Sequence, residues 1–469
     1  MSDRSPGTQV AIVSLGCAKN LVDSEVMAGL LQEAGFGLTV EADEADVVVV
    51  NTCGFIEPAQ REAITTILEL ARAKQAGRLR GLVVAGCLPR RFSAQEVARE
   101  LPEADAVIGT AELPLIADVV RGVLRGERFV LAEQAPSFLY HDRMPRMRST
   151  PGHLAYVKVS EGCDHPCTFC TIPRIRGPYR SRPMESIVEE VERLADEGVQ
   201  EVVLIGQDTT MYGADLYGRL MLPELLRRLG RTGVAWVRLL YAYPAHVTPE
   251  LVAAMAEAPN VCHYLDMPLQ HASDRILRAM RRWGNRRAYE TLLARVREAM
   301  PDVALRTTFI VGFPGERESD LQALLDFMEA VEFDHVGVFA YAREEGTPSA
   351  AMEEHVPARE RRRRRATVMA HQQRLLDRVA ARRMQAPVEL LLERPGRQPG
   401  EWVARSAYQA PEVDGVTWVR GEHGTAGQRI RGRITGRQGP YDFLAVPDPS
   451  DLGGDRAPWY NRPTSASVR

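Results

Sequence analysis

The chain has 469 residues, of which 45% are hydrophobic and 26% are charged, and its formal net charge is −3. Such a composition suits two or three globular domains and argues against a generally basic nucleic-acid coat. The start MSDRSPGTQV lacks an apolar signal region, and no later stretch reaches the ~18 uninterrupted apolar residues of a membrane span. We therefore expect a soluble, cytoplasmic protein with no membrane partner.

Apolar runs alternate with amphipathic stretches over residues 8–125. The expected strands are VAIVSLG, VVVVNTC, GLVVAGC and AVIG, and the expected helices are Asp23 to Ala34, Glu57 to Lys74, Ala94 to Leu101 and Pro114 to Leu124. Short strands between helices predict a doubly wound parallel sheet. Residues 126–148 lose this periodicity and are rich in Pro, Ser, Met and Arg, which predicts a linker.

A second alternating series fills residues 149–384. Its strand candidates are LAYVKVS, EVVLIG, WVRLLYAY, CHYLDMPL, RTTFIVGF and HVGVFAYA. Six strands separated by helical stretches predict a partial (β/α) barrel, which the run from Ala358 to Met384 ends. Five successive arginines, Arg361 to Arg365, could form a nucleic-acid patch, but such a run is more often a solvated helix face, which we expect here.

Short β segments punctuated by Gly and Pro fill residues 387–448 and predict a small antiparallel β-barrel. This segment has eight Arg and no Lys against eight acidic residues, so it is balanced rather than basic. Its aromatic residues Trp402, Tyr408 and Trp418 could be contacts or core. The final residues, 449–469, are rich in Pro, Asp, Gly, Arg and Ser, and we expect them to be disordered.

Three thiols lie close together in EGCDHPCTFC, directly after the strand candidate LAYVKVS: Cys163, Cys167 and Cys170. The chain has seven cysteines, an odd number that fits reduced thiols better than a disulfide framework. Three thiolates can hold a 4Fe–4S cluster and leave its fourth iron free. That iron can take S-adenosylmethionine (SAM), whose sulfonium bond an electron from the cluster can break.

A zinc site is the alternative for this loop, because thiolates also hold zinc and His165 lies among them. Its position between two thiols would force a very tight chelate. A closed zinc site would also give a large barrel no evident chemistry, so the spacing favours the cluster.

Three further thiols, Cys17, Cys53 and Cys87, lie far apart in sequence, but each follows a strand candidate of the first domain and has a neighbouring glycine. A parallel sheet gathers such residues at its carboxyl edge, where ligands bind. The alternative is three unrelated core thiols, because a buried cysteine often behaves as a small hydrophobe. The matching positions favour a second cluster, whereas Cys262 lacks this context and is expected in the core or near the site.

These motifs resemble, over almost the whole chain, the radical methylthiotransferase family, which has an N-terminal cluster domain, a radical SAM barrel and a C-terminal TRAM domain. SLGCAKNLVDSE at Ser14 to Glu25 is similar to the RimO-type branch, which modifies a ribosomal protein; the tRNA-modifying relatives tend to show GCQMN there. Ala18 stands where the RimO-type branch usually has proline. The blocks YLDMPLQHAS, RTTFIVGFPGE and RSAYQAPEVDG agree with this branch.

The resemblance implies methylthiolation of the β-carbon of an aspartate in the twelfth protein of the small ribosomal subunit. It also implies two 4Fe–4S clusters with different tasks. The cluster on Cys163, Cys167 and Cys170 would generate a 5′-deoxyadenosyl radical from SAM, and an auxiliary cluster on Cys17, Cys53 and Cys87 would carry the sulfur. A second SAM would donate the methyl group.

Residues at the carboxyl ends of barrel strands should line the cofactor site. The candidates are Phe169, beside the third thiol, and Gly206, Gln207, Gln270, His271, Arg306, Gly312 and Glu316. Each has a structural alternative. Phe169 could pack only against the loop, Gln270 and His271 could cap a helix, Arg306 could form a structural ion pair, and the GFPGE turn could simply reverse the chain.

The implied partners are the ribosomal protein or the small ribosomal subunit, and an electron donor such as flavodoxin or ferredoxin; no DNA partner is expected. Two other functions stay open: a tRNA adenosine methylthiotransferase (MiaB-type) with the same chemistry, and a non-catalytic zinc- or RNA-binding ribosome-associated protein. RNA-binding modules normally need excess positive charge, so the balanced last module fits a basic ribosomal protein better than tRNA.

Overall fold

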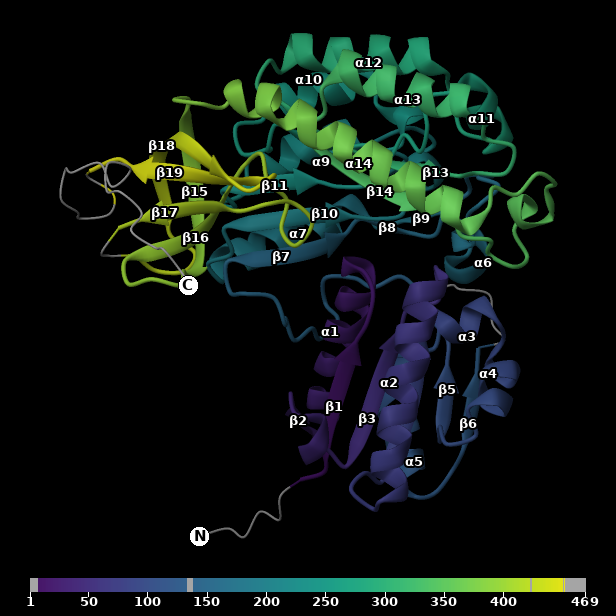
Figure 1. Ribbon diagram of the computed structural model, residues 1–469. Coiled ribbons are helices and arrows are strands. Elements are labelled where there is room, and N and C mark those ends of the chain that lie inside the picture. The colour runs from purple at the N-terminus through teal and green to yellow at the C-terminus, as the bar shows by residue number, and fades with distance from the viewer. Residues whose placement is uncertain (1–6, 133–137, 422–423, 450, 452–469) are drawn as a thin grey trace, which may run out of the picture. The chain divides into compact units, whose positions relative to one another are not determined.

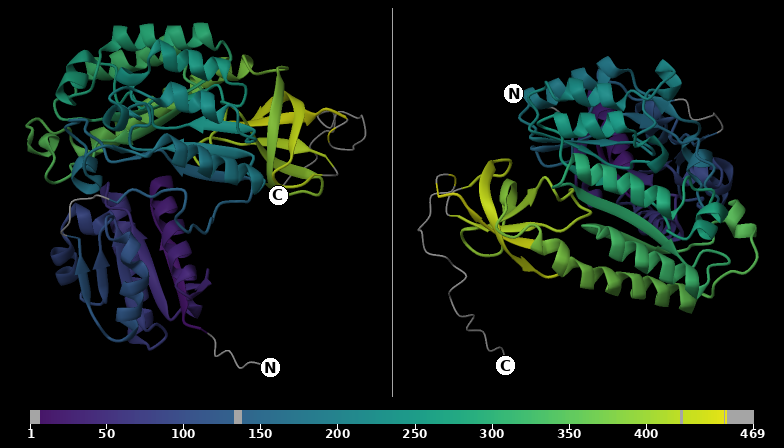
Figure 2. Two further views of the ribbon diagram at one scale, coloured as in Figure 1. Left: turned by 180° about the vertical axis from the view of Figure 1, so that it is seen from behind. Right: turned by 90° about the horizontal axis from the view of Figure 1, so that it is seen from above.

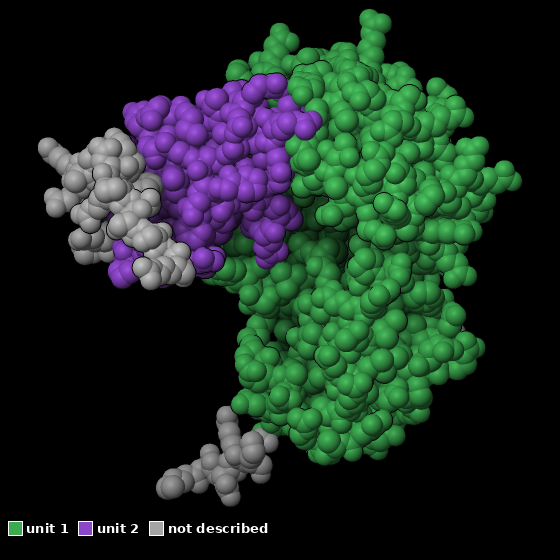
Figure 3. Space-filling view, in the orientation of Figure 1, with its two compact units in different colours: residues 1–372 green, residues 373–469 purple. Residues whose placement is uncertain are grey.

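The computed structural model describes residues 7–132, 138–421, 424–449 and 451 (Figure 1). The chain forms two compact units, residues 1–372 and 373–469, which Figure 3 colours separately. The predicted disordered tail, 449–469, lies almost entirely outside the described residues. In the described ranges, no helix is both long enough and apolar enough to cross a membrane.

Six parallel strands form the sheet of the N-terminal domain, which confirms the predicted parallel sheet and adds two strands to the four predicted. Their order is β2 (Gly37–Thr39), β1 (Gln9–Ser14), β3 (Val47–Thr52), β4 (Gly81–Gly86), β5 (Ala106–Ile108) and β6 (Phe129–Leu131). Every residue of β3 and β4 is buried, because helices cover both faces of the sheet. Alternate residues of β3 serve the two faces: Val47 and Val49 pack on one side, and Val48 and Val50 pack on the other.

The helices divide between these two faces, and Figure 1 and the reverse view in Figure 2 show the domain from opposite sides. One layer holds α1 (Ala18–Glu33) and α5 (Ile116–Leu124), and the other holds α2 (Glu57–Gln75), α3 (Leu88–Arg91) and α4 (Ala94–Glu100). The turns η1 (Ala42–Glu44) and η2 (Leu113–Leu115) complete the domain. The carboxyl ends of β1, β3 and β4 therefore meet at one edge of the sheet.

Two edge strands were not predicted. β2 is three residues long, and β6 lies inside the segment 126–148, which the sequence marks as a linker. β6 pairs in parallel with β5 through the short apolar run Phe129–Leu131, so the sheet continues beyond the predicted domain boundary. β2 and β6 are partly exposed edge strands that sequence pattern distinguishes poorly from loop, whereas β5, which is equally short, is fully buried and was predicted from the run AVIG.

The rest of unit 1 is a partial barrel of six parallel strands, as predicted. The sheets β7-β10-β11 and β12-β13-β14 are joined by a bridge between Val237 and Val261. The strands are β7 (Leu154–Lys158), β10 (Glu201–Ile205), β11 (Trp236–Leu239), β12 (Tyr264–Asp266), β13 (Ala304–Val311) and β14 (His335–Ala340). β8 (Ser160–Glu161) pairs in an antiparallel manner with β9 (Arg180–Ser181), which fixes both ends of the segment that connects β8 to β9.

Helices accompany these strands along the chain. They are α6 (Ile172–Arg176), α7 (Met184–Asp196), α8 (Ala214–Tyr217), α9 (Leu222–Leu229), α10 (Pro249–Glu257), α11 (Asp274–Ala279), α12 (Arg286–Ala299), α13 (Glu318–Val331) and α14 (Ala358–Ala381), with the turns η3 (Pro244–His246) and η4 (Pro348–Ala351). The boundary between the two compact units falls inside α14.

The arginine run on α14 does not form a uniformly solvated face, which corrects the prediction. Arg364 is buried and its guanidinium donates a hydrogen bond to Glu316 Oε1 at 2.9 Å. Arg361 donates to the backbone oxygen of Tyr341. Arg365 Nε donates to Val338 O of β14 at 2.9 Å. Because a helix turns about 100° per residue, five successive arginines cannot share one face, and these three bond to the barrel.

Unit 2 contains a closed barrel of five strands: β15 (Pro387–Pro395), β16 (Glu401–Ser406), β17 (Thr417–Arg420), β18 (Arg429–Gln438) and β19 (Asp442–Pro447). All pairs are antiparallel except β17 and β19. A closed ring with an odd number of strands must contain a parallel pair, since strand directions cannot alternate throughout. Trp402 and Tyr408 pack against the barrel core, and Trp418 Nε1 donates to Asp442 at 3.2 Å.

Gly162, which precedes the first thiol of the loop, provides a test of how the fold shapes this segment. Its φ is +80°, and a Cβ atom there would lie 2.0 Å from the Pro178 backbone oxygen. Gly162→Ala should therefore lower the melting temperature and the iron content. The matched control is Gly198→Ala, where φ is +90° but the space is open, so the substitution costs only about 1–2 kcal/mol of backbone strain. Equal melting temperatures for the two variants would contradict this account.

Candidate functional site

The loop that carries Cys163, Cys167 and Cys170 connects β8 to α6, and its backbone is fixed from several sides. Cys163 N donates to Gly177 O at 3.2 Å, and Thr168 N donates to Met280 O at 3.1 Å. Cys163 is buried, whereas the other two thiols are half-buried. The three thiols are thus presented by an ordered loop at the carboxyl end of the first barrel strand.

Burial favours the protonated form of two of these thiols, Cys163 and Cys170, in the absence of metal. It raises the pKa of Cys163 and that of Cys170 to about 12. A metal group must therefore displace protons and supply positive charge to hold them as thiolates.

The spacing of the thiols does not match a single zinc ion. Thiolates around one tetrahedral zinc lie roughly 3.8 Å apart, given Zn–S bonds of about 2.3 Å. Among the described residues, the group of three ligand atoms lying within 4.8 Å of one another is His165, Asp208 and His246, and neither set of three cysteines qualifies. Wider spacing is expected where a larger inorganic core lies between the sulfurs.

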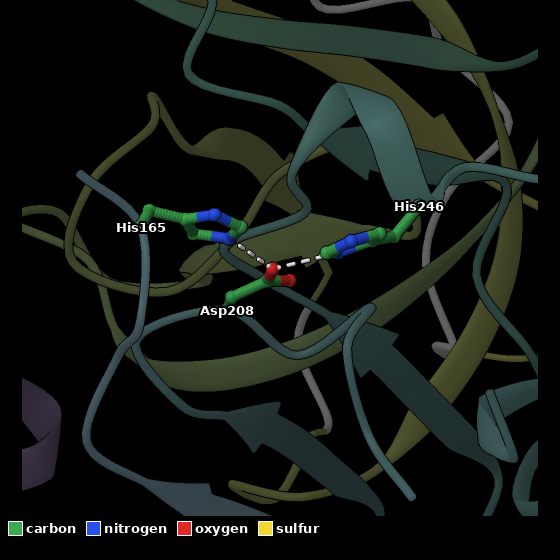
Figure 4. Close-up of side chains that lie close together, drawn as sticks. All are labelled: His165, Asp208 and His246. Carbon is green, nitrogen blue, oxygen red and sulfur yellow. Dashed lines mark hydrogen bonds and ion pairs between the residues drawn. The ribbon is translucent and has the colours of Figure 1, made fainter. Parts of the chain in front are cut away.

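His165 contacts Asp208 and Tyr243, which does not match the zinc ligand that the alternative interpretation requires. Its Nε2 lies 2.7 Å from Asp208 Oδ2, and His246 Nδ1 lies 2.9 Å from the same oxygen (Figure 4). Burial would raise the pKa of Asp208, but hydrogen bonds from both histidines and from Thr210 lower it. The ring of His165 also stacks on Tyr243 with centroids 3.6 Å apart. The histidine is therefore held as a structural part of the loop.

The second set of thiols converges at the carboxyl edge of the N-terminal sheet. Cys17 precedes α1, Cys53 follows β3, and Cys87 lies between β4 and α3. A Cβ atom on Gly16, whose φ is +93°, would lie 3.1 Å from Cys53 Sγ, which explains a glycine beside Cys17. Cys17 is exposed, Cys53 is half-buried and Cys87 is buried, so the set is open on the side of Cys17.

Two cations cross between the N-terminal domain and the barrel at this set of thiols. Lys19 Nζ lies 3.3 Å from the centre of the Tyr241 ring and 3.4 Å from Gly206 O in the barrel. In the opposite direction, Arg176 of α6 donates to Cys87 Sγ at 3.2 Å. Desolvation opposes ionisation of Cys17, but Lys19 and Arg176 outweigh it and lower the pKa of its thiol.

A buried ionic network surrounds Arg176. Its Nη1 lies 2.7 Å from Asp23 Oδ2 of α1, and Asp23 Oδ1 lies 2.6 Å from Lys158 Nζ of β7. Lys158 also pairs with Glu161 at 2.6 Å. The Asp-Ser-Glu part of the first motif therefore joins α1 to the barrel next to both sets of thiols.

Four of the predicted cofactor residues lie at strand ends as expected. Gly206 follows β10 and its oxygen faces Lys19, and Gln207 donates to Glu161 at 2.9 Å. The side-chain oxygens of Gln207 and Gln270 are buried without a hydrogen-bond partner among the described residues. Gln270, at φ +74°, bridges to β13 through its backbone, so it is not a helix cap. His271 Nδ1 does accept from Ser273 N, just before α11.

The other four predicted residues have structural contacts. Arg306 pairs with Asp266 at 2.7 Å. Glu316 Oε2 accepts from Gly312 N at 2.7 Å, so the GFPGE turn is braced by its own carboxylate. Phe169 packs with the apolar cluster of Ile276, Met280, Phe313 and Tyr341.

Sequence reasoning missed Lys19, Arg176, Asp208 and Tyr243. Asp208 could have been predicted as a site residue, because it directly follows Gly206 and Gln207 at a strand end. The roles of the others depend on contacts between segments distant in sequence; the Lys19 contact spans 187 residues.

The thiol loop at the end of the first barrel strand, the partial barrel and the ligand spacing define an enzyme of the radical SAM class. Comparison with known proteins agrees. The chain matches the models of the Radical SAM superfamily at residues 157–328, of the Uncharacterized protein family UPF0004 at residues 9–109 and of the TRAM domain at residues 386–447. The first match implies a 4Fe–4S cluster and SAM.

The relatives specify the family. The chain is 48% identical to the ribosomal protein uS12 methylthiotransferase RimO of Heliobacterium modesticaldum, over 94% of this chain and 96% of that protein. It is also 48% identical to the protein of the same name from Symbiobacterium thermophilum, over 95% and 94% of the two chains. The chain belongs to the RimO family of methylthiotransferases.

A solved structure shows the same fold at low identity. The radical S-adenosylmethionine methyltransferase TsrM from Kitasatospora setae matches with a TM-score of 0.54 and 16% identity, over 73% of this chain and 77% of that one.

The thiol environments predict an order of reactivity in metal-free protein. At neutral pH, Cys17 should react with iodoacetamide faster than Cys163, because Cys17 is exposed with a lowered pKa whereas the pKa of Cys163 is about 12. A lower pKa means a larger thiolate fraction, and the thiolate is the nucleophile. Peptide mass spectrometry over time measures both rates, and urea-unfolded protein is the control in which they should converge. Faster labelling of Cys163 in folded protein would show that the environments are assigned wrongly.

Proposed function

We propose that this chain methylthiolates the β-carbon of an aspartate of ribosomal protein uS12. In this proposal a 4Fe–4S cluster on Cys163, Cys167 and Cys170 works together with SAM. A second 4Fe–4S cluster, on Cys17, Cys53 and Cys87, carries the sulfur. The relatives named for uS12 support the substrate, and the two sets of thiols support the chemistry.

The observation that carries the proposal is a pair of cations that cross between the N-terminal domain and the barrel beside Cys17 and Cys87. Lys19, two residues from Cys17, binds Gly206 at the end of a barrel strand, while Arg176, six residues from Cys170, binds Cys87. A sulfur donor must lie near the carbon radical that it attacks. Lys19 and Arg176 hold the N-terminal domain against the barrel beside Cys17 and Cys87, which supports the proximity that sulfur insertion requires.

The clusters, when bound, supply the electron that splits SAM and the sulfur that is inserted. The chain's own residues supply charge and orientation. Lys19 and Arg176 offset the negative charge of the thiolates on Cys17, Cys53 and Cys87. Both cations are buried, with 9% exposure for Lys19 and 3% for Arg176.

Gln207 and Gln270 are the strongest candidates for SAM contacts. Each has a buried side-chain oxygen with no hydrogen-bond partner in the described part of the chain. An unsatisfied buried acceptor costs about 1–3 kcal/mol, and a ligand's amino or hydroxyl group would satisfy it. Gly206 and Phe169 stay predictions for the same site, whereas Gly312 and Glu316 are better explained as a braced turn.

The C-terminal barrel favours a protein substrate over tRNA. Several of its arginines already pair within unit 2, such as Arg405 with Glu393 at 2.6 Å and Arg429 with Glu389 at 2.9 Å. Paired guanidinium groups are less available to phosphates, which dominate affinity for nucleic acid.

The test is incubation of reconstituted enzyme with uS12, SAM and a reductant. We expect uS12 to gain the mass of one methylthio group at an aspartate. Cys163→Ala should abolish 5′-deoxyadenosine formation. Cys53→Ala should retain SAM cleavage but stop sulfur insertion. Chromatography of deoxyadenosine and mass spectrometry of uS12 measure these outcomes.

Unmodified tRNA in a parallel reaction is the control for substrate. Methylthio nucleosides in tRNA, with uS12 unchanged, would replace the substrate assignment with tRNA. Equal loss of SAM cleavage in Cys163→Ala and Cys53→Ala would refute the division of labour between the two sets of thiols.

The remaining expectations are part of the same proposal. The electron donor is a flavodoxin or ferredoxin, DNA is not a partner, and the reaction takes place in the cytoplasm. The functional domains are the N-terminal domain, expected at residues 8–125 and extended to Leu131 by β6, then residues 149–384 and 387–448.

A further inference from the structure

A guanidinium group lies against one thiol of the radical SAM loop. Arg282 follows α11, and its Nη1 lies 3.6 Å from Cys167 Sγ, while Nη2 donates to Pro268 O at 2.6 Å. The preceding residue, Arg281, has φ +51°, an uncommon backbone conformation for a residue other than glycine. Such strain persists only where surrounding structure enforces it, so the turn that aims Arg282 at the thiol is specifically maintained.

The segment that carries Arg282 is bonded directly to the thiol loop. Thr168 N donates to Met280 O at 3.1 Å, and Thr168 Oγ1 donates to Ala279 O at 2.9 Å. Thr168 is the neighbour of Cys167. The relative position of guanidinium and sulfur is therefore set by two short hydrogen bonds and does not depend on a flexible surface segment.

Arg282 lacks the partner that a half-buried guanidinium usually has. Its contacts in the described part of the chain are a sulfur, a carbonyl oxygen and aromatic side chains, and none is a carboxylate. Its Nε is buried without a hydrogen-bond partner. Because an enclosed cation without an anion is costly, the thiolate of Cys167 is the anion that this arrangement requires.

A stack of side chains holds the guanidinium in place. The Tyr243 ring lies between the guanidinium of Arg282, 4.3 Å from its centre, and the ring of His165, 3.6 Å away. His165 is anchored in turn by Asp208 (Figure 4). Asp208 accepts from both histidines with one oxygen and from Thr210 with the other, so its acceptor positions are filled. By ligand type, His165, Asp208 and His246 could hold a divalent cation. Because the acceptor positions of Asp208 are filled by hydrogen bonds, we infer that the three residues stabilise the loop.

We propose that Arg282 is a positioning residue that raises the reduction potential of the 4Fe–4S cluster by donating a hydrogen bond to Cys167. Reduction adds one electron, from a low-potential one-electron donor, to a cluster whose thiolates already carry negative charge. A fixed positive charge at a ligand sulfur stabilises the reduced state more than the oxidised state. Arg282 thereby favours reduction of the cluster, which supplies the electron that splits SAM.

The test compares Arg282→Gln and Arg282→Lys with the holoenzyme in a redox titration followed by electron paramagnetic resonance. The signal of this cluster is the one that changes when SAM is added. We expect Arg282→Gln to reduce the ratio of reduced to oxidised cluster at least tenfold at a fixed potential, which corresponds to about 59 mV for one electron. Arg282→Lys should restore part of this loss. Arg278→Gln, on the exposed side of α11, is the matched control and should titrate like the wild type.

Two outcomes would overturn the proposal. One is an unchanged potential in Arg282→Gln with full iron content. The other is an unchanged potential in the absence of SAM together with weaker SAM binding, which would make Arg282 a contact to SAM. If Arg282→Gln fails to retain iron, Tyr243→Leu decides, because it removes the ring that holds the guanidinium and leaves the thiols intact. It should lower the potential below that of the wild type, and an unchanged potential there would also refute the proposal.

Discussion

The reciprocal contacts of Lys19 and Arg176 are the interaction on which the rest of the site depends. Lys19 of the N-terminal domain contacts Gly206 O in the barrel. Arg176 of the barrel donates to Cys87 Sγ in the N-terminal domain. Removing one partner from a buried ionic pair typically costs about 3–5 kcal/mol. The two cations, with Asp23 and Lys158 behind them, therefore fix the N-terminal sheet against the barrel edge where the thiol loop lies.

Charge explains why this arrangement suits iron-sulfur chemistry. Thiolates within each set repel one another, and burial raises the pKa of Cys87 and that of Cys163 to about 12, which makes these two thiols costly to ionise. Fixed cations reduce this cost next to each set: Arg176 at Cys87 and Arg282 at Cys167. The protein thus supplies part of the positive charge, and the metal supplies the rest.

The sequence was sufficient for the parts that depend on local pattern. The valine run of β3 predicts a strand buried on both faces, and thiols after β1, β3 and β4 are brought to one edge by the topology of a parallel sheet. β6 was missed because it is a short, partly exposed edge strand, and the parallel pair β17–β19 follows from ring closure, which no local pattern encodes.

The site could be predicted only as far as its thiols and strand ends. Lys19 lies in a recognised motif, yet its partner is 187 residues away, and nothing in the local pattern distinguishes Arg282 from the other arginines around it. Arg364, expected in solvent, is buried against Glu316 for the same reason. Contacts of this kind arise from packing between segments distant in sequence, and periodicity carries no information about them.

Metal content tests the central claim most directly, namely that two sets of three thiols each hold a cluster. Anaerobically reconstituted full-length protein should contain about eight irons per chain and negligible zinc, as two four-iron clusters require. About four irons per chain, or stoichiometric zinc, would contradict the account.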